Sequence, residues 1–165
     1  MILSIVDIYR EAEMGEIVSQ IIANRIIQTG AVAWVSSQVI KTILHLIVNK
    51  KIVWERLVGD GGMPSSHSAT VTSVAIATGF TAGWDSAIFA VAVFFAIIVM
   101  HDARGVRRET GKQAVVINDM LEFFEQMGAG TLTPEQTLKE FVGHTPLQVI
   151  AGAIIGFIVA VLINH

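Results

Sequence analysis

The amino-acid sequence predicts an all-α integral membrane protein, a helical bundle with about four transmembrane spans. The chain has 165 residues, of which 53% are hydrophobic and only 15% are charged, and its mean hydropathy is +0.63. These values are high for a soluble globular protein, and the apolar residues gather in long runs. We expect a single membrane domain over residues 1–165, with an N-terminal segment at 1–23 and a core at 24–163.

The charge and the cysteine content exclude several classes of protein. The net charge of -3 gives no general attraction to nucleic acid, so no nucleic-acid partner is expected. The chain has no cysteine, which excludes disulfides, thiolate nucleophiles and cysteine-based zinc sites.

The N-terminal segment, residues 1–23, is expected to stay on the chain and to lie on the membrane surface. Its first residues are acidic where a secretory signal peptide is basic. Ile2, Ile5, Val6 and Tyr9 recur at helical spacing, which is typical of a short amphipathic helix at a membrane interface.

Four apolar segments approach the ~20 residues that a helix needs to cross a bilayer. The first contains Lys41 and His45, the second carries no formal charge apart from any on His67, and the fourth has no ionisable group. Only a short turn around 83–85 separates the second segment from the third, so these two should form an antiparallel hairpin. The expected spans are 26–48, 64–83, 86–100 and 146–163.

Most basic residues lie in two long connections, 49–63 and 101–144, which the positive-inside rule places in the cytoplasm. The opposite side offers little beyond Arg25 and Arg10. We therefore expect a multi-pass protein of the cell (inner or plasma) membrane whose polar groups converge on the cytoplasmic face. The basic residues of the two connections are Lys50, Lys51, Arg56, Arg104, Arg107, Arg108, Lys112 and Lys139.

The connection 101–144 contains helix signals of its own. The stretch 118–127 is amphipathic, and the glycines within 128–130 should end a helix there. Thr133 and Gln136 fit a capping box that would start a further helix.

Two of the expected spans begin at the cytoplasmic face with similar signals. Thr145 and Gln148 fit a capping box around Pro146, and the second span opens at Pro64. Each helix start presents free backbone N–H groups and the positive end of the helix dipole, an arrangement that binds phosphate. The histidines beside these two starts are His67 and His144.

Three segments resemble the divergent branch of the type-2 phosphatidic acid phosphatases, a branch related to acid phosphatases and vanadium haloperoxidases. They stand in the order and spacing of that branch, and the resemblance runs from about residue 24 to residue 163. The segments are "GGMPSSHSA" (61–69), "HDARGVRRETGKQA" (101–114) followed by "IN", and "GHTPLQVIAG" (143–152).

The resemblance implies a helical core that hydrolyses phosphate monoesters or diphosphates, typically of lipids, with no divalent metal and no other cofactor. It implies that His144 attacks phosphorus and that His67 protonates the leaving alcohol. Lys41 matches the lysine of the first family motif. The further phosphate contacts would come from Ser65, Ser66, Arg104, Arg107 and Arg108.

The residue types suit this chemistry. A phosphate monoester needs positive groups around its non-bridging oxygens as charge shifts to the leaving oxygen. Arginine supplies a fixed fork of donors, and lysine supplies a point charge. A histidine nucleophile must be neutral whereas a general acid must be protonated, and two histidines with different neighbours can divide these roles.

The histidines and the lysine also have purely structural explanations. His67 and His144 could be ordinary histidines of helix starts. Lys41 could extend toward the membrane interface, but Gln38, Lys41 and His45 lie on one helical face, which favours an inward position.

The other unusual residues have structural explanations too. The arginines could serve membrane topology alone. His101 and Asp102 could form a metal pair, but few other acids lie nearby in the sequence, so no metal site is expected. The Gly-xxx-Gly pairs at 79–83 and 152–156 would allow close helix packing within the chain or between copies of it.

Three positions depart from the resemblance. The superfamily has an aspartate, and the divergent branch usually a glutamate, where this chain has Gln148. A neutral amide orients an imidazole less well than a carboxylate, so Gln148 could serve as the capping residue alone while Asp102 orients His144. Leu138 stands at the place of an arginine, and His101 at that of a tyrosine.

The sequence therefore predicts a phosphohydrolase that removes phosphate from a lipid phosphate through a phosphohistidine. Phosphatidic acid, phosphatidylglycerol phosphate and polyprenyl (di)phosphate are all open as substrates. The alternatives are a catalytically weak or inactive phospholipid- or anion-binding membrane protein and, less favoured, a small-molecule transporter. Expected partners are the lipid substrate and the bilayer, with a homo-oligomer through the Gly-xxx-Gly faces as an option.

Overall fold

The computed structural model describes residues 5–50, 62–127, 138 and 143–165, without the side chains of residues 5–12 and of Arg107. Within these ranges every regular element is an α-helix, which confirms the all-α prediction. The helices are α1 (Ile5–Ala23), α2 (Arg25–Asn49), α3 (Ser66–Ala82), α4 (Ala87–Arg104), α5 (Val106–Gln126) and α6 (Pro146–Asn164).

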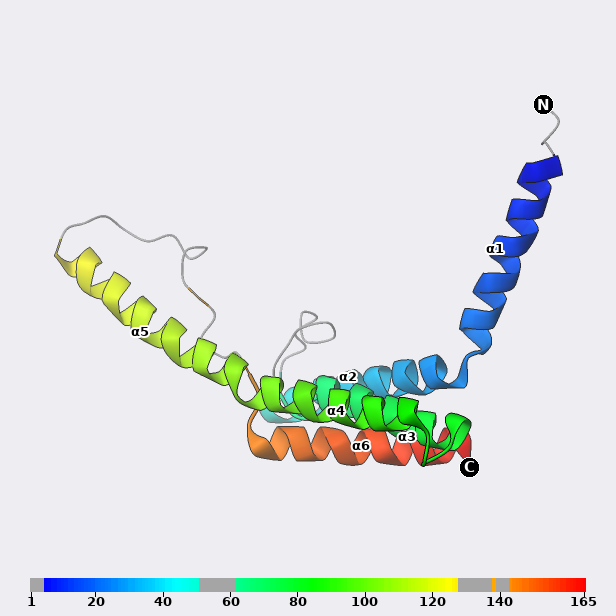
Figure 1. Ribbon diagram of the computed structural model, residues 1–165. Helices are drawn as coiled ribbons and strands as arrows, with labels where there is room; N and C mark the ends of the chain where they lie inside the picture. Colours follow the sequence, from blue (N-terminus) through cyan, green and yellow to red (C-terminus); the bar gives the residue numbers. More distant parts are fainter. Residues whose placement is uncertain (1–4, 51–61, 128–137, 139–142) are drawn as a thin grey trace.

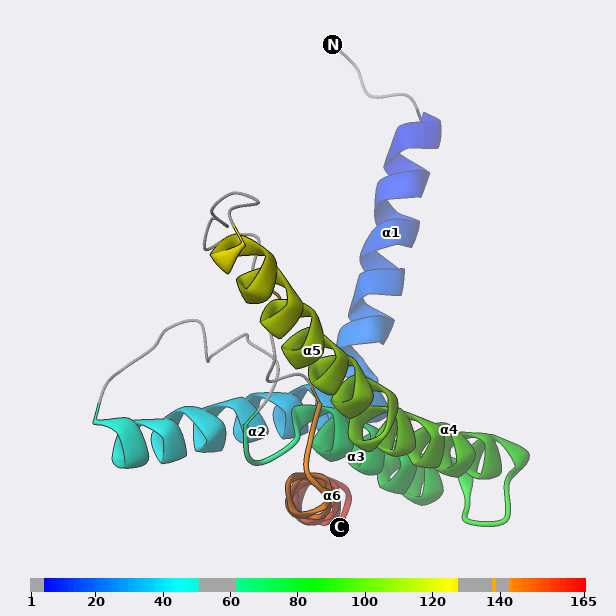
Figure 2. The ribbon, with the colours of Figure 1, turned by 90° about the vertical axis from the view of Figure 1, so that its left-hand side faces the viewer.

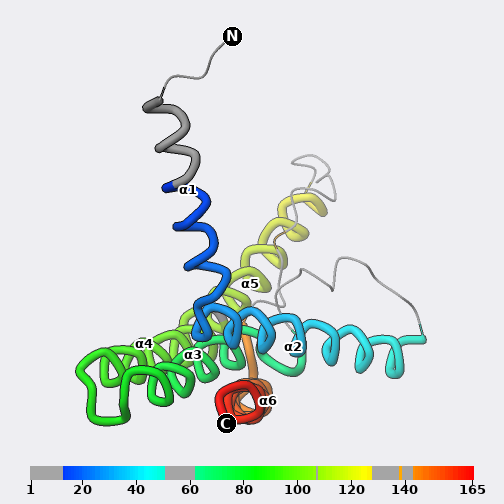
Figure 3. Tube along the Cα trace, turned by 90° about the vertical axis from the view of Figure 1, so that its right-hand side faces the viewer, coloured from blue at the N-terminus to red at the C-terminus, as the bar shows by residue number. Residues whose placement is uncertain are grey.

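Helix α3 forms the centre of the bundle, with α2, α4 and α6 packed around it (Figure 1). Helix α2 also packs along α6, whereas α2 and α4 flank α3 without packing against each other in the described part of the chain. Figure 2 shows α6 end-on, with α2, α3 and α4 lying across it. Helices α1 and α5 project away from this bundle, and Figure 3 shows α1 rising from it beside the start of α2.

Small side chains allow α3 to occupy the centre. Its buried positions are serine, alanine, threonine and glycine, with Val71 as the largest. On α6, Gly152 and Gly156 lie directly on the backbone of Ser65 and Ala69, whose carbonyl oxygens would overlap a Cβ at either glycine. Close backbone approach through glycine is a common way for helices to associate in membranes. The 152–156 pair is thus used within the chain.

The second Gly-xxx-Gly pair is also covered within the chain. The ring of Trp84, in the turn between α3 and α4, lies against Gly79 and leaves no room for a side chain there. Packing inside the chain therefore accounts for the 152–156 pair and for Gly79, and Gly83 supplies the positive φ of +94° at the end of α3. A homo-oligomer stays a prediction that these contacts do not support.

Hydroxyl groups inside the bundle are satisfied largely by their own helices. Ser73 and Thr78 each donate to a backbone carbonyl of α3 at 2.8 Å. Such bonds offset the cost of burying a hydroxyl away from water. At the far end of the bundle, Asn164 Nδ2 donates to Thr29 Oγ1 at 3.1 Å, which ties α6 to α2.

Three helical stretches in the described ranges are long and apolar enough to cross a membrane: α2, α6 and the run formed by α4 with α5. The fourth expected span, α3, has 17 residues. A helix of that length measures about 26 Å, slightly less than the ~30 Å of a bilayer's hydrocarbon core. The helices on three sides of α3 leave it little surface to present to lipid. The bundle fits the predicted integral membrane protein.

The four core helices alternate in direction, as the hairpin prediction requires. Helices α2 and α4 run toward the end of the bundle at which α3 and α6 begin (Figure 1), although the last turns of α2 diverge from the other three helix ends (Figure 2). Both long connections therefore start and finish toward this end of the bundle, as predicted. The side of the membrane that this end faces stays a prediction.

The helix boundaries between α4 and α6 correct one prediction. We expected a helix at 118–127, but α5 already begins at Val106. The bend at Gly105 takes only one residue, so the chain resumes its helix at once and the amphipathic stretch becomes the second half of α5. The expected glycine stop at 128–130 and the capping box of Thr133 lie outside the described residues.

The two helix starts were predicted with different success. Helix α6 begins at Pro146 as expected, with Thr145 and Gln148 forming a complete capping box. Helix α3 begins later than predicted, because Ser65 is the N-cap and accepts a hydrogen bond from the Ser68 N–H at 3.3 Å. Pro64 therefore lies outside the helix, just before its cap.

The N-terminal segment is helical, as predicted, over Ile5–Ala23. Asn24 then breaks the helix and caps α2, accepting hydrogen bonds from the N–H groups of Ile26 and Ile27. The apolar side chains of Met14 and Ile17 on α1 are exposed. Placement on the membrane surface stays a prediction, and the side chains of the first expected apolar residues are outside the described part.

Gly156→Ala is predicted to destabilise the bundle, because the added Cβ would overlap the backbone of Ala69 and push α6 away from α3. Overpacking of this kind typically costs about 1–3 kcal/mol. The matched control is Gly15→Ala in α1, where nothing lies within 4 Å of the added methyl group and the change should be neutral or mildly stabilising. Thermal unfolding in detergent compares the two; equal melting temperatures would contradict this packing.

Candidate functional site

Two histidines from distant parts of the sequence meet at one end of the bundle. His67 lies in the first turn of α3, and His144 lies just before the N-cap of α6. Their ring centroids are 5.8 Å apart and the ring planes are inclined by 60°. The contact between α3 and α6 explains this proximity, because the Ser65 N–H donates to the Gln148 carbonyl at 3.0 Å. Both helix starts are thereby held side by side.

His144 is buried and is held in place by two hydrogen-bonding contacts. Its side chain is buried, with 3% exposed. Its backbone N–H donates to the carbonyl of Ala103 in α4 at 2.9 Å. Its ring Nδ1 lies 3.3 Å from Oε1 of Gln148, one turn further along α6. Gly143, at φ +94°, supplies the left-handed backbone that turns the chain into this position.

The contact with Gln148 determines which ring nitrogen of His144 carries a proton. The backbone N–H of Thr145 also points at Gln148 Oε1, at 3.0 Å. A backbone N–H can only donate, so the atom facing it must be the amide oxygen. The same oxygen can only accept, so His144 donates from Nδ1 and keeps the lone pair of a neutral ring on Nε2. Gln148 thus acts as capping residue and contacts the His144 ring, whereas capping alone, with Asp102 orienting His144, was one of the possibilities that the sequence left open.

Lys41 points into the bundle, in agreement with the inward position that its helical face favours. Its side chain is 2% exposed, and Nζ donates to Ser66 Oγ at 3.4 Å. The aliphatic stem lies beside Gly62, whose φ of +85° is the left-handed conformation that glycine tolerates. A buried ammonium is costly unless acceptors surround it, and the Ser66 hydroxyl is one such acceptor. The role of Lys41 in phosphate binding stays a prediction.

The two serines before His67 have different positions. Ser65 is fully buried and its hydroxyl is used as the cap of α3. Ser66 faces Lys41 and is also buried. Of the two, Ser66 is therefore better placed to contact a bound group.

The acidic and basic residues of α4 and α5 are less closely assembled. Asp102 is half-buried near the end of α4, next to the carbonyl that holds His144. Arg104 and Arg108 are exposed, and Arg107 lies on α5 with its side chain outside the described part. The structure brings the two histidines, Lys41 and Ser66 together, whereas the described arginines lie at the surface.

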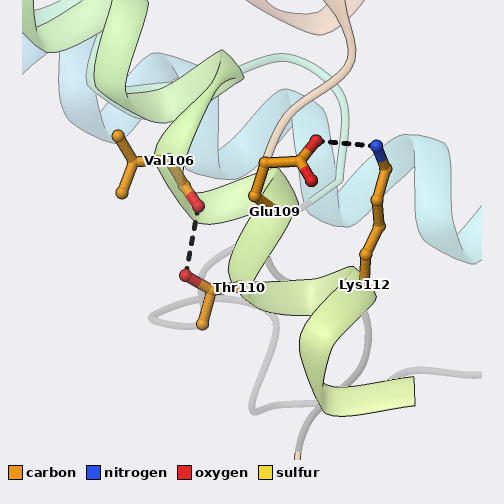
Figure 4. Close-up of polar contacts among 4 residues, drawn as sticks. All are labelled: Val106, Glu109, Thr110 and Lys112. Carbon is orange, nitrogen blue, oxygen red and sulfur yellow. Dashed lines mark hydrogen bonds and ion pairs between the residues drawn. The ribbon is translucent and has the colours of Figure 1, made fainter. Parts of the chain in front are cut away.

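Lys112, another basic residue of the connection 101–144, forms an ion pair within α5. Its Nζ lies 2.6 Å from Oε1 of Glu109, one turn earlier (Figure 4). Both side chains are more than half exposed, so this pair contributes little to stability. Figure 4 also shows Thr110 donating to the Val106 carbonyl, a bond within the first turns of α5.

Two amides were not predicted as site or structural residues. Asn118 on α5 donates to the Leu138 carbonyl and accepts from the Leu138 N–H, both at 3.0 Å. These two bonds fasten Leu138 to α5. Gln38 lines a cavity of about 230 Å³ together with Ser66 and His67. Its position one turn before Lys41 on the same helical face was the signal that could have identified it.

These features define a class: a helical membrane protein in which two histidines meet at two helix starts beside a buried lysine. The chain matches the Divergent PAP2 family over residues 22–159 and belongs to that family. It is 36% identical over 154 residues to a protein of Bacillus subtilis (strain 168) described as "Uncharacterized membrane protein YuiD", with 88% of this chain and 98% of the relative covered. No solved structure matches the chain.

The family and the relative bear out two predictions. The expected resemblance to divergent type-2 phosphatidic acid phosphatases is confirmed. A membrane location agrees with the description of the relative and with the apolar helices.

The tautomer of His144 is a direct test of the site geometry. Nitrogen NMR of histidine-labelled protein in detergent should show neutral His144 protonated at Nδ1. Gln148→Glu keeps an acceptor at the same place and should preserve this tautomer, whereas Gln148→Leu should lose it together with the helix cap. Exposed His101 is the internal control. An Nε2-protonated His144 in the unmodified protein would contradict the assigned geometry.

Proposed function

We propose that the protein is a membrane phosphohydrolase that removes phosphate from a lipid phosphate through a phosphohistidine intermediate. The observation that carries this proposal is the pair of imidazoles 5.8 Å apart, one of them held through its Nδ1 by Gln148. A phosphoryl group can lie between two such rings with one nitrogen on phosphorus and the other on the leaving oxygen.

In the first step, Nε2 of His144 attacks phosphorus and the bond from phosphorus to the ester oxygen breaks. Protonated His67 gives its proton to that oxygen, and the alcohol leaves. In the second step, water attacks the phosphohistidine and gives a proton to His67, which is now neutral. Inorganic phosphate is released and both histidines return to their starting states.

Positive groups around the phosphate would stabilise the charge that develops in both steps. The buried ammonium of Lys41 and the starts of α3 and α6 lie at this end of the bundle. Arg104, Arg107 and Arg108 are close in sequence to Ala103, which contacts His144, and could move onto a bound phosphate. Asp102 is a second candidate for orienting a histidine.

We further propose that the site faces the cytoplasm in the inner or plasma membrane. The positive-inside rule supports this orientation, because the lysines and arginines concentrate in the connections at the site end of the bundle. The phosphate of a lipid in the cytoplasmic leaflet would then lie level with the two histidines.

A specific observation favours a second candidate function, a phospholipid- or anion-binding protein with little or no turnover. The group that contacts Nδ1 of His144 is the uncharged amide of Gln148. An amide stabilises the imidazolium formed during turnover less than a carboxylate does. Binding needs only the lysine and the helix starts, so it tolerates this substitution.

Phosphate release from a panel of lipid phosphates, with and without EDTA, distinguishes the two candidates. The phosphohydrolase should release phosphate in EDTA, and His144→Ala or His67→Ala should reduce the rate by about 10²-fold or more. His165→Ala, at the opposite end of α6, is the matched control and should leave the rate unchanged.

A second measurement separates a slow enzyme from a binding protein. Rapid quenching with radiolabelled substrate should trap a phosphoprotein that is absent from His144→Ala. Saturable binding of the lipid phosphates with neither release nor a phosphoprotein would establish the second candidate instead.

A further inference from the structure

A cavity of about 230 Å³ lies beside the paired histidines, on the side of α3 where α2 and α4 do not pack against each other. Ser66 and His67 form its site end, Gln38 and Trp34 line it from α2, and Val99 lines it from α4. If the proposed function holds, the leaving oxygen must face the general acid His67. The leaving alcohol then occupies this cavity, because His67 lines it.

The side-chain oxygen of Gln38 in this cavity has no hydrogen-bond partner among the described residues. The side chain of Gln38 is 4% exposed, and its Oε1 accepts no hydrogen bond within the described residues. A buried acceptor without a donor is costly, so such an atom usually meets a ligand or an ordered water.

Three neighbouring hydroxyls, those of Ser37, Thr42 and Thr70, do not fill this role, since their protons are used elsewhere. Thr70, which also lines the cavity, donates to the Ser66 carbonyl at 2.8 Å. Ser37 donates to the Trp34 carbonyl at 2.8 Å, and Thr42 donates to the Gln38 backbone carbonyl at 2.9 Å. The donor for Gln38 Oε1 must therefore come from outside this group of side chains.

We propose that Gln38 is a specificity residue that accepts a hydrogen bond from a free hydroxyl on the leaving alcohol. This inference rests on the proposed function and narrows its substrate class to phosphate monoesters of a polyol, such as a glycerol phosphate headgroup of a phospholipid. The alcohols released from phosphatidic acid and from a polyprenyl phosphate carry no second hydroxyl beside the reacting oxygen. They would leave the Gln38 acceptor buried and unsatisfied. Trp34 and Val99 provide apolar walls for the carbon chain of the polyol.

The test compares two phosphonates that cannot be hydrolysed, 3-hydroxybutylphosphonate and butylphosphonate, which differ only by one hydroxyl. Titration calorimetry with full-length protein in detergent should give about tenfold or tighter binding of the hydroxylated compound, since a site built to bond a hydroxyl rejects an analogue lacking it. Gln38→Met should remove this preference by weakening the hydroxylated compound alone. Retained binding of butylphosphonate shows that the variant is folded.

The matched control is Ser37→Ala, next to Gln38 and equally buried but outside the cavity lining, which should keep the preference. If Gln38→Met does not fold, Gln38→Asn, with a shorter acceptor, should reduce the preference instead. Equal binding of the two phosphonates by the unmodified protein would show that water satisfies Gln38 and would overturn the proposal. An unchanged preference in a folded Gln38 variant, or no binding of either compound, would also overturn it.

The phosphonate experiment can fail or succeed independently of the test of the proposed phosphohydrolase function. A protein that discriminates between the phosphonates yet releases no phosphate from any lipid retains the polyol pocket and loses the phosphohydrolase assignment. A protein that releases phosphate but does not discriminate loses the pocket assignment only.

Discussion

The close approach of α6 to α3 is the constraint on which the site depends. Gly152 and Gly156 allow the α6 backbone to rest on that of Ser65 and Ala69, where any side chain would overlap a carbonyl oxygen. The hydrogen bond from the Ser65 N–H to the Gln148 carbonyl fixes the two helices lengthwise. As a result two helix starts and their histidines face the same space, although they are far apart in the sequence. The glycines therefore allow the close helix approach that places the two histidines side by side.

The polar groups at this end are buried among apolar helices, where a charged or polar side chain without partners raises the free energy of the folded state. Lys41 is buried, and Gln148 uses one oxygen for both the helix cap and the His144 ring. The same oxygen thus links helix stability to ring orientation, so changes at Gln148 affect both. A neutral amide at this position holds the tautomer but adds no negative charge, which leaves the site more positive and favours a bound anion. We therefore expect the protein to bind phosphate tightly but to turn over slowly.

Much of this fold is predictable from the sequence, because membrane spans are long apolar runs and helix starts carry local signals. The capping box of Thr145 and Gln148 is an example, since all of its partners lie within one turn. Features that depend on how several polar groups share or lack partners were missed. The bond between Gln148 and His144 requires the cap and the ring to share one oxygen, and the orphan acceptor of Gln38 appears only once neighbouring hydroxyls are seen to be engaged. The exposed positions of Arg104 and Arg108 likewise differ from the phosphate contacts that the resemblance implied.

The central claim is that both histidines act on one phosphoryl group, and a structure with bound vanadate tests it most directly. Vanadate resembles the five-coordinate transition state of phosphoryl transfer and should bind between the rings. We expect vanadium bonded to Nε2 of His144, with a vanadate oxygen within hydrogen-bond distance of His67. Vanadate bound to His67 alone, or at a place that touches neither ring, would contradict it.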